Sequence, residues 1–266
     1  MRIKHDSIDI YSQQEQLPEI KEVVVFAEHE YGMASLLAAN TILGDREPDA
    51  KIMSHLISEM AFNAAPKLSS VGWDLYFEGH TAFLCVTNWP QVALYPPESS
   101  KGTWIYTYPV VRDTVDFLKS LGAKNLYYLS STTVHEALDP EVFEPLSPKI
   151  LKHYEYGMEN EEDNLFFTPP TWMFPYLAHE IGYEHSEAIM SGCADDEKID
   201  KEAGWALANW LSDYMGSDYK LTKSNYNTIV KEFTALVNKH EKLREEVMNT
   251  MSALNTSTIP SEHMWG

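Results

Sequence analysis

Hydrophobic runs that alternate with helical patterns organise the first part of the chain. Residues 22–28 (EVVVFAE) form a continuous apolar run rich in β-branched side chains, which predicts a strand buried on both faces. After a polar loop, residues 36–44 (LLAANTILG) predict a short helix that ends at Gly44. Residues 51–57 (KIMSHLI) predict a second strand, so we expect the first crossover to be a βαβ unit.

Two alternating stretches, WDLYFEG and HTAFLCVTN, meet at Gly79 and His80 and predict an antiparallel hairpin. Residues 107–123 then predict a helix that ends at Gly122, and the apolar run NLYYLSS after it predicts another buried strand. Residues 170–192 repeat the order of helix, glycine and strand. The repeated alternation predicts an α/β protein with an open, mostly parallel sheet, helices on both faces and an added β-hairpin.

The C-terminal part differs, because residues 221–254 predict one long helix. Its apolar positions recur every seven residues along two seams. One seam is formed by Tyr226, Phe233, Val247 and Leu254 with a polar break at His240, and the other by Ile229, Leu236 and Leu243. Such a helix either packs on its own domain or mediates self-association. We therefore expect an α/β domain at residues 1–220, a long helix at 221–254 and a flexible tail at 255–266.

Charge and composition exclude several classes of partner. The chain has 266 residues with 40 acidic and 20 basic side chains, giving a net charge of -20 that repels nucleic acids and anionic membranes. No apolar window is long enough to span a membrane and the N-terminus lacks the apolar core of a signal peptide, so a cytoplasmic location is expected. Cys85 and Cys193 stand in apolar segments and are expected to be buried, reduced thiols.

Motifs for phosphate binding and for a nucleophile elbow are missing from the sequence. His179 and His185 are six residues apart, which does not place them on one helical face as zinc ligands, so neither a metal nor a cofactor is expected. Ligands of open α/β sheets bind at the carboxyl ends of strands. Two groups follow such ends and form a candidate pocket: Glu28, His29, Glu30 and Gly32, and Ser130, Ser131, Thr132 and Thr133. An α/β enzyme, either a hydrolase or a nucleotide-dependent ligase, is one hypothesis for this pocket.

The order of elements supports a different hypothesis. VVVFAEHEYGMASLLAANTIL, the hairpin at Gly79, VDFLKSLGAKNLYYLSS and the segment that begins at LAHEIGYEHSEAIMSGC together resemble the proteasome assembly chaperone family, in its archaeal and bacterial branch. In the first loop, Glu30 and Gly32 match the family's acidic and second glycine positions, whereas Ala27 and Glu28 replace its glycine and aromatic residue. The strand NLYYL is followed by SSTTVHEALDP instead of a glycine-rich turn. The resemblance implies a non-enzymatic scaffold that self-associates as a homo-oligomer and contacts proteasome α-ring subunits.

The last residues, SEHMWG, fit this second hypothesis. Met264, Trp265 and Gly266 resemble the ending of hydrophobic residue, tyrosine and any residue with which proteins dock on the proteasome α-ring, with tryptophan in place of tyrosine. The resemblance implies that the terminal carboxylate pairs with a lysine between α subunits while the aromatic ring fills an apolar cleft. Residues 255–263 (NTSTIPSEH) would be the tether. The alternative is that Trp265 packs on its own domain.

Overall fold

The computed structural model describes residues 1–27, 33–54, 72–86, 103–133, 150–155, 169–193, 199–215 and 221–256. The chain divides into two compact units, Met1–Leu221 and Thr222–Gly266, which are considered one after the other.

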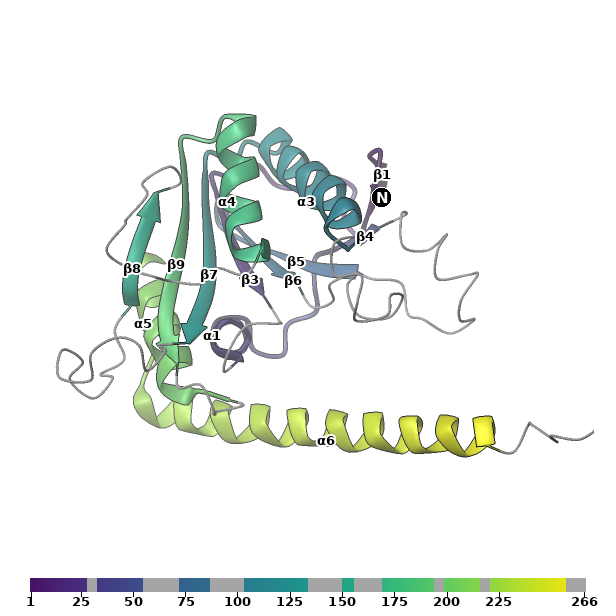
Figure 1. Ribbon diagram of the computed structural model, residues 1–266. Coiled ribbons are helices and arrows are strands. Elements are labelled where there is room, and N and C mark those ends of the chain that lie inside the picture. The colour runs from purple at the N-terminus through teal and green to yellow at the C-terminus, as the bar shows by residue number, and fades with distance from the viewer. Residues whose placement is uncertain are drawn as a thin grey trace, which may run out of the picture. The chain divides into compact units, whose positions relative to one another are not determined.

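The first unit is built on a mixed sheet, which is visible in Figure 1. Its nine described strands are β1 (Arg2–Lys4), β2 (Ile8–Ser12), β3 (Glu22–Ala27), β4 (Ala50–Ser54), β5 (Gly72–Glu78), β6 (Thr81–Val86), β7 (Asn125–Thr133), β8 (Ile150–Glu155) and β9 (His185–Cys193). Their order across the sheet is β1-β2-β4-β5-β6-β3-β7-β9-β8. β6, β3, β7 and β9 pair in parallel at the centre, and the other neighbours are antiparallel. The predicted α/β class is confirmed.

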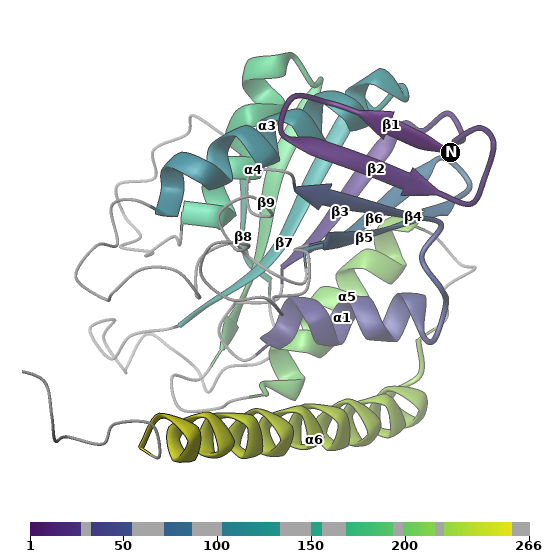
Figure 2. The ribbon, with the colours of Figure 1, turned by 90° about the vertical axis from the view of Figure 1, so that its right-hand side faces the viewer.

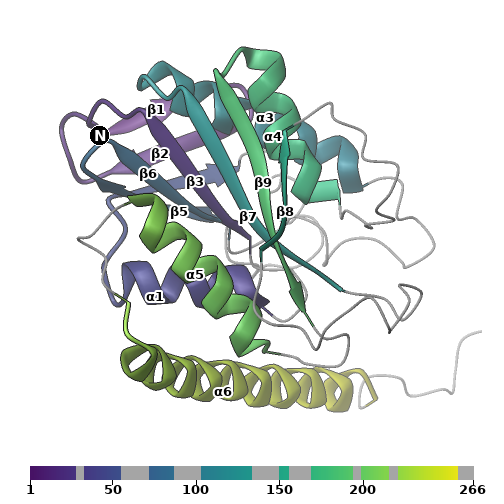
Figure 3. The ribbon, with the colours of Figure 1, turned by 90° about the vertical axis from the view of Figure 1, so that its left-hand side faces the viewer.

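Helices cover both faces of this sheet, as Figures 2 and 3 show from opposite sides. The helices of the first unit are α1 (Ala34–Leu43), α3 (Thr103–Ser120), α4 (Pro169–Ile181) and α5 (Lys201–Met215). β3 shows why both faces need a cover. Val23 and Val25 pack with residues of α3 and α4, whereas Val24 and Phe26 pack with residues of α1 and α5. A strand buried on both faces needs a continuous apolar run, which is what the sequence provides.

Glycines end the elements where the sequence predicts. β5 and β6 form the predicted hairpin, and Gly79 in its turn has a φ of 57°, which glycine adopts without steric cost. α3 and α4 end just before Gly122 and Gly182, which also have positive φ values. At Gly122 a Cβ atom would lie 2.9 Å from the carbonyl oxygen of Ile20, so this position also lacks room for a side chain.

The first crossover differs from the expected βαβ unit of adjacent strands. Two antiparallel pairings lead from β6 to β4, so β4 runs in the same direction as β3, but β5 and β6 lie between them. The reason is that the later hairpin places β6 beside β3, where the apolar side chains of Val25 and Phe26 are in register with Leu84 and Cys85. Sheet order depends on such non-local pairing and not on the local pattern of one helix.

Strands β1, β2 and β8 are absent from the sequence-based prediction. β1 has only three residues, which is too short for a recognisable pattern. β2 shows no alternation of buried and exposed positions, because Asp9 is buried like its apolar neighbours Ile8 and Ile10. The carboxylate of Asp9 is paired with the guanidinium of Arg2, which explains how a buried strand tolerates it. β8 reads ILKHYE, where charged and polar residues interrupt the apolar pattern.

The second unit contains α6 (Lys223–Thr256), which confirms the predicted long C-terminal helix. Residues 257–266 lie outside the described part of the chain. None of the described helices is both long and apolar enough to cross a membrane.

Candidate functional site

The carboxyl ends of the central strands share one edge of the sheet. Because β6, β3, β7 and β9 are parallel, Val86, Ala27, Thr133 and Cys193 end at the same side. This carboxyl edge is the place where open α/β sheets bind ligands. The first group of predicted pocket residues, Glu28, His29, Glu30 and Gly32, follows β3 there but lies outside the described residues.

The second predicted group lies within β7, not in a loop after it, and this changes what the hydroxyls can do. Ser130 and Ser131 are both buried, but they point to opposite faces because side chains alternate along a strand. Ser130 follows Tyr128 toward α3 and α4, and Ser131 follows Leu129 toward α1 and α5. Thr132 and Thr133 continue the strand, with side chains outside the described part. The described hydroxyls of Ser130 and Ser131 therefore do not face one common pocket.

Two further hydroxyls accompany Ser131 and escaped the sequence-based search. Ser191 of β9 is the register partner of Ser131, and its residue is fully buried. Ser35 of α1 donates a hydrogen bond from Oγ to the carbonyl oxygen of Leu129 at 2.7 Å. In the sequence, Ser191 belongs to the segment SGC at the end of an apolar run. A single small polar residue in such a segment does not indicate a binding site. Topology alone brings these residues together.

Both cysteine side chains of the chain are buried in the first unit. Cys85 lies on β6 and Cys193 on β9, and they form no disulfide with each other. Burial, with a smaller contribution from Asp74, raises the pKa of Cys85 to about 12, so this side chain stays a neutral thiol at physiological pH.

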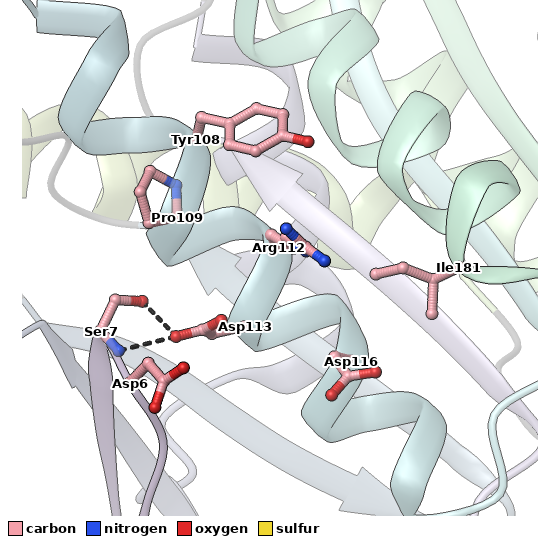
Figure 4. A pocket seen from close by; sticks show the side chains of 8 residues that line it. All are labelled: Asp6, Ser7, Tyr108, Pro109, Arg112, Asp113, Asp116 and Ile181. Carbon is pink, nitrogen blue, oxygen red and sulfur yellow. Dashed lines mark hydrogen bonds between the residues drawn. The ribbon is translucent and has the colours of Figure 1, made fainter.

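A separate surface hollow of about 570 Å³ lies along α3 (Figure 4). It is lined by Asp6, Ser7, Tyr108, Pro109, Arg112, Asp113, Asp116 and Ile181. The residues come from the turn between β1 and β2, from α3 and from the end of α4. No residue pattern pointed to this hollow, because its walls are distant in sequence.

Hydrogen bonds in the hollow join the N-terminal turn to α3. The carboxylate of Asp113 accepts one bond from the backbone N–H of Ser7 at 2.7 Å and another from its hydroxyl at 2.5 Å. Arg112 is exposed in the same hollow and forms no ion pair with Asp6, Asp113 or Asp116 among the described interactions. The hollow thus has three carboxylates and one guanidinium. The hydrogen bonds accepted by Asp113 connect the N-terminal turn to α3, which is a structural role.

Comparison with known proteins identifies the fold. No protein-family model matches the sequence, and no curated protein is similar to it at a significant level. The structure is similar to that of Pyrococcus furiosus PbaB, an archaeal proteasome activator, with a TM-score of 0.56 and 12% identity over 89% of this chain and 100% of that one. It is also similar to P. furiosus PbaA, an archaeal homologue of proteasome-assembly chaperone, with a TM-score of 0.57 and 12% identity over 90% and 99% of the two chains.

A Thermoplasma acidophilum protein of unknown function has the same fold, with a TM-score of 0.53 and 11% identity over 87% of this chain and 91% of that one. Identities this low show the shared fold alone. The resemblance to the proteasome assembly chaperone family is therefore confirmed for the fold.

Proposed function

We propose that this chain is a non-enzymatic, proteasome-binding protein of the assembly-chaperone kind, which docks on the proteasome α-ring through Met264, Trp265 and Gly266. The observation that carries the proposal is the fold shared with PbaA and PbaB over nearly the whole length of those proteins. The sequence of the C-terminal tripeptide supplies the docking chemistry.

Each residue of the tripeptide has a role in this proposal. Gly266 carries the terminal carboxylate, which pairs with a lysine between two α subunits and has no side chain to obstruct it. The indole of Trp265 fills an apolar cleft, and Met264 packs beside it with a flexible, polarizable side chain. Capture of a C-terminal carboxylate together with its neighbouring side chains is a common mode of peptide recognition.

Docking also needs reach. Seven residues, Ser257 to His263, separate the end of α6 from Met264. They are mostly polar and include Pro260, a composition typical of tethers. Fully extended, such a tether spans about 23 Å, enough to present the tripeptide beyond the end of a helix.

We also propose that the chain self-associates through α6. The helix has 34 residues, and among its described side chains Leu236 is 52% exposed. Leu236 belongs to the seam that Ile229 and Leu243 share in the sequence, and an exposed leucine in a seven-residue repeat favours helix pairing.

Binding to purified 20S proteasomes tests the docking proposal. Deletion of Met264–Gly266 is expected to abolish binding, as measured by mass photometry and by biolayer interferometry. The matched control deletes Thr258–Pro260, which removes the same number of residues from the tether and is expected to retain binding. Addition of one alanine after Gly266 is expected to weaken binding, because it displaces the carboxylate. Unchanged binding after loss of the tripeptide would refute this docking mode.

Light scattering tests self-association separately. Replacing both Leu236 and Leu243 with glutamate is expected to lower the molar mass that light scattering measures as the protein elutes from a size-exclusion column. The control is Asn238→Glu, which adds a charge on the same helix at an exposed position outside the seam. An unchanged mass in the double variant, or an equal fall in the control, would contradict a role for the seam.

A further inference from the structure

One buried hydroxyl at the carboxyl edge has no hydrogen-bond partner among the residues that the structure describes. The residue Ser191 is 0% exposed, and its Oγ atom accepts and donates no hydrogen bond. Leaving a buried hydroxyl unpaired is costly, and most such groups in native proteins bind a protein group, an ordered water or a ligand. Ser191 faces the same side of the sheet as Ser131, Ile189 and Cys193, which is the side covered by α1 and α5.

The helices above this position begin in different ways. At the start of α5, Oδ1 of Asp200 accepts hydrogen bonds from the backbone N–H groups of Glu202 at 3.0 Å and Ala203 at 2.9 Å. At the start of α1, Met33 is the N-cap residue and supplies no side-chain hydrogen bond, and no acidic residue stands in the first turn. The first N–H groups of an α-helix have no partner within the helix and attract negative charge. The structure thus supplies a carboxylate for α5 and none from its described residues for α1.

The sheet brings the start of α1 close to Ser191. The hydroxyl of Ser35, in the first turn of α1, bonds to the carbonyl oxygen of Leu129. Ser131 is two residues further along β7, and Ser191 is its partner on the adjacent strand. With strands about 4.8 Å apart and a rise of about 3.3 Å per residue, the Cα atoms of Leu129 and Ser191 are separated by about 8 Å. Figure 3 shows the N-terminal ends of α1 and α5 beside the carboxyl ends of β7 and β9.

We propose that this corner of the carboxyl edge binds a small oxyanion, which accepts hydrogen bonds from the first-turn N–H groups of α1 and from the hydroxyl of Ser191. The ligand class is a carboxylate or a phosphate, since both present several acceptor oxygens and negative charge to a helix N-terminus. The site is independent of α-ring docking by the C-terminal residues.

Thermal unfolding of the full chain, with potassium phosphate or sodium acetate at constant ionic strength, tests the proposal. A ligand that binds only the folded state raises the melting temperature in a saturable way. A rise with phosphate but not acetate identifies a phosphate site, and the reverse identifies a carboxylate site. Isothermal titration calorimetry then gives the affinity. If neither anion changes the melting temperature relative to chloride, the proposal is wrong.

Ser191→Ala is the first variant. It removes a buried hydroxyl that has no partner among the described residues, so the variant is expected to fold with a ligand-free stability equal to or higher than that of the wild type. It should bind the anion about tenfold more weakly, because it lacks a hydrogen bond to a charged group. The matched control is Ser54→Ala, because Ser54 is also a buried strand serine with an unpartnered Oγ but lies on β4, three positions from β3 in the sheet order. Equal affinity in Ser191→Ala and the wild type would overturn the assignment.

Met33→Asp tests the helix end without altering Ser191. A carboxylate at this position is expected to take the place of the ligand, as Asp200 does for α5, and so to remove the anion-dependent rise in melting temperature. The control Met33→Asn has a side chain of nearly the same shape without the charge, and it should retain most of the anion response. If the aspartate variant responds to the anion as the asparagine variant does, the start of α1 is not part of the site.

Discussion

Lys119 of α3 caps the C-terminal end of α4 with its side chain. Its replacement by methionine is expected to destabilise the first unit. Its Nζ atom donates hydrogen bonds to the carbonyl oxygen of Ile181 and, at 3.0 Å, to that of Gly182. The last carbonyls of a helix have no partner within it and carry the negative end of the helix dipole. The ammonium also lies 6.0 Å from the ring centroid of Tyr183. One side chain therefore satisfies groups that would otherwise depend on water.

The size of the effect follows from these contacts. Hydrogen bonds to a charged group contribute about 1.5–3 kcal/mol when buried, and this site is only partly buried, so we expect a loss of about 1–2 kcal/mol. Methionine keeps most of the aliphatic stem of lysine, and the loss therefore reports on the ammonium group. For a unit of this size, a change of 1 kcal/mol lowers the melting temperature by about 2–4 °C, which gives an expected fall of roughly 2–8 °C.

Thermal and urea unfolding followed by circular dichroism measure this loss. The matched control is Lys124→Met, because Lys124 pairs with Glu184 at 2.6 Å and both side chains are more than half exposed. Water and salt screen such a pair, so no measurable change in melting temperature is expected. If the two variants lose equal stability, or if Lys119→Met loses none, the two carbonyl groups do not depend on the ammonium and the reasoning is refuted.

Three further substitutions test other parts of the fold. Asp113→Ala leaves the buried N–H and hydroxyl of Ser7 without their acceptor, so hydrogen exchange in residues 1–12 should accelerate and stability should fall by about 1–3 kcal/mol. Gly122→Ala places a Cβ atom 2.9 Å from the carbonyl oxygen of Ile20 at a φ of 105°, and a urea titration should show a loss of at least about 1 kcal/mol. Burial raises the pKa of Tyr183 well above its ordinary value of 10.0, so the unfolded chain loses this proton first and stability should fall as pH rises above about 10. Urea midpoints between pH 8 and 11 should fall less steeply in Tyr183→Phe, and an unchanged slope would contradict the role of this phenol.

The local pattern of apolar residues and glycines was enough to predict the strands and helices at the centre of the first unit. The run at residues 22–28 is apolar at successive positions because β3 packs against helices on both faces. Gly79, Gly122 and Gly182 end elements with positive φ values that other residues rarely adopt, so they marked the turns correctly. These signals are carried by single residues and their immediate neighbours.

The candidate site was less predictable, because it depends on strand direction and pairing. Ser130 and Ser131 are adjacent in the sequence but point to opposite faces, whereas Ser131 and Ser191 are distant in the sequence but adjacent in the sheet. A search of the sequence groups the first pair and misses the second. The same limit explains the first crossover, since nothing in residues 51–57 shows that a later hairpin places β6 beside β3.

The most direct test of the proposed function is the affinity of the full chain for isolated proteasome α-rings, measured with and without Met264–Gly266. We expect saturable binding by the full chain and none above background by the shortened chain, with both proteins folded by circular dichroism. Equal affinity of the two proteins, or no binding by either, would contradict a function based on the C-terminal tripeptide.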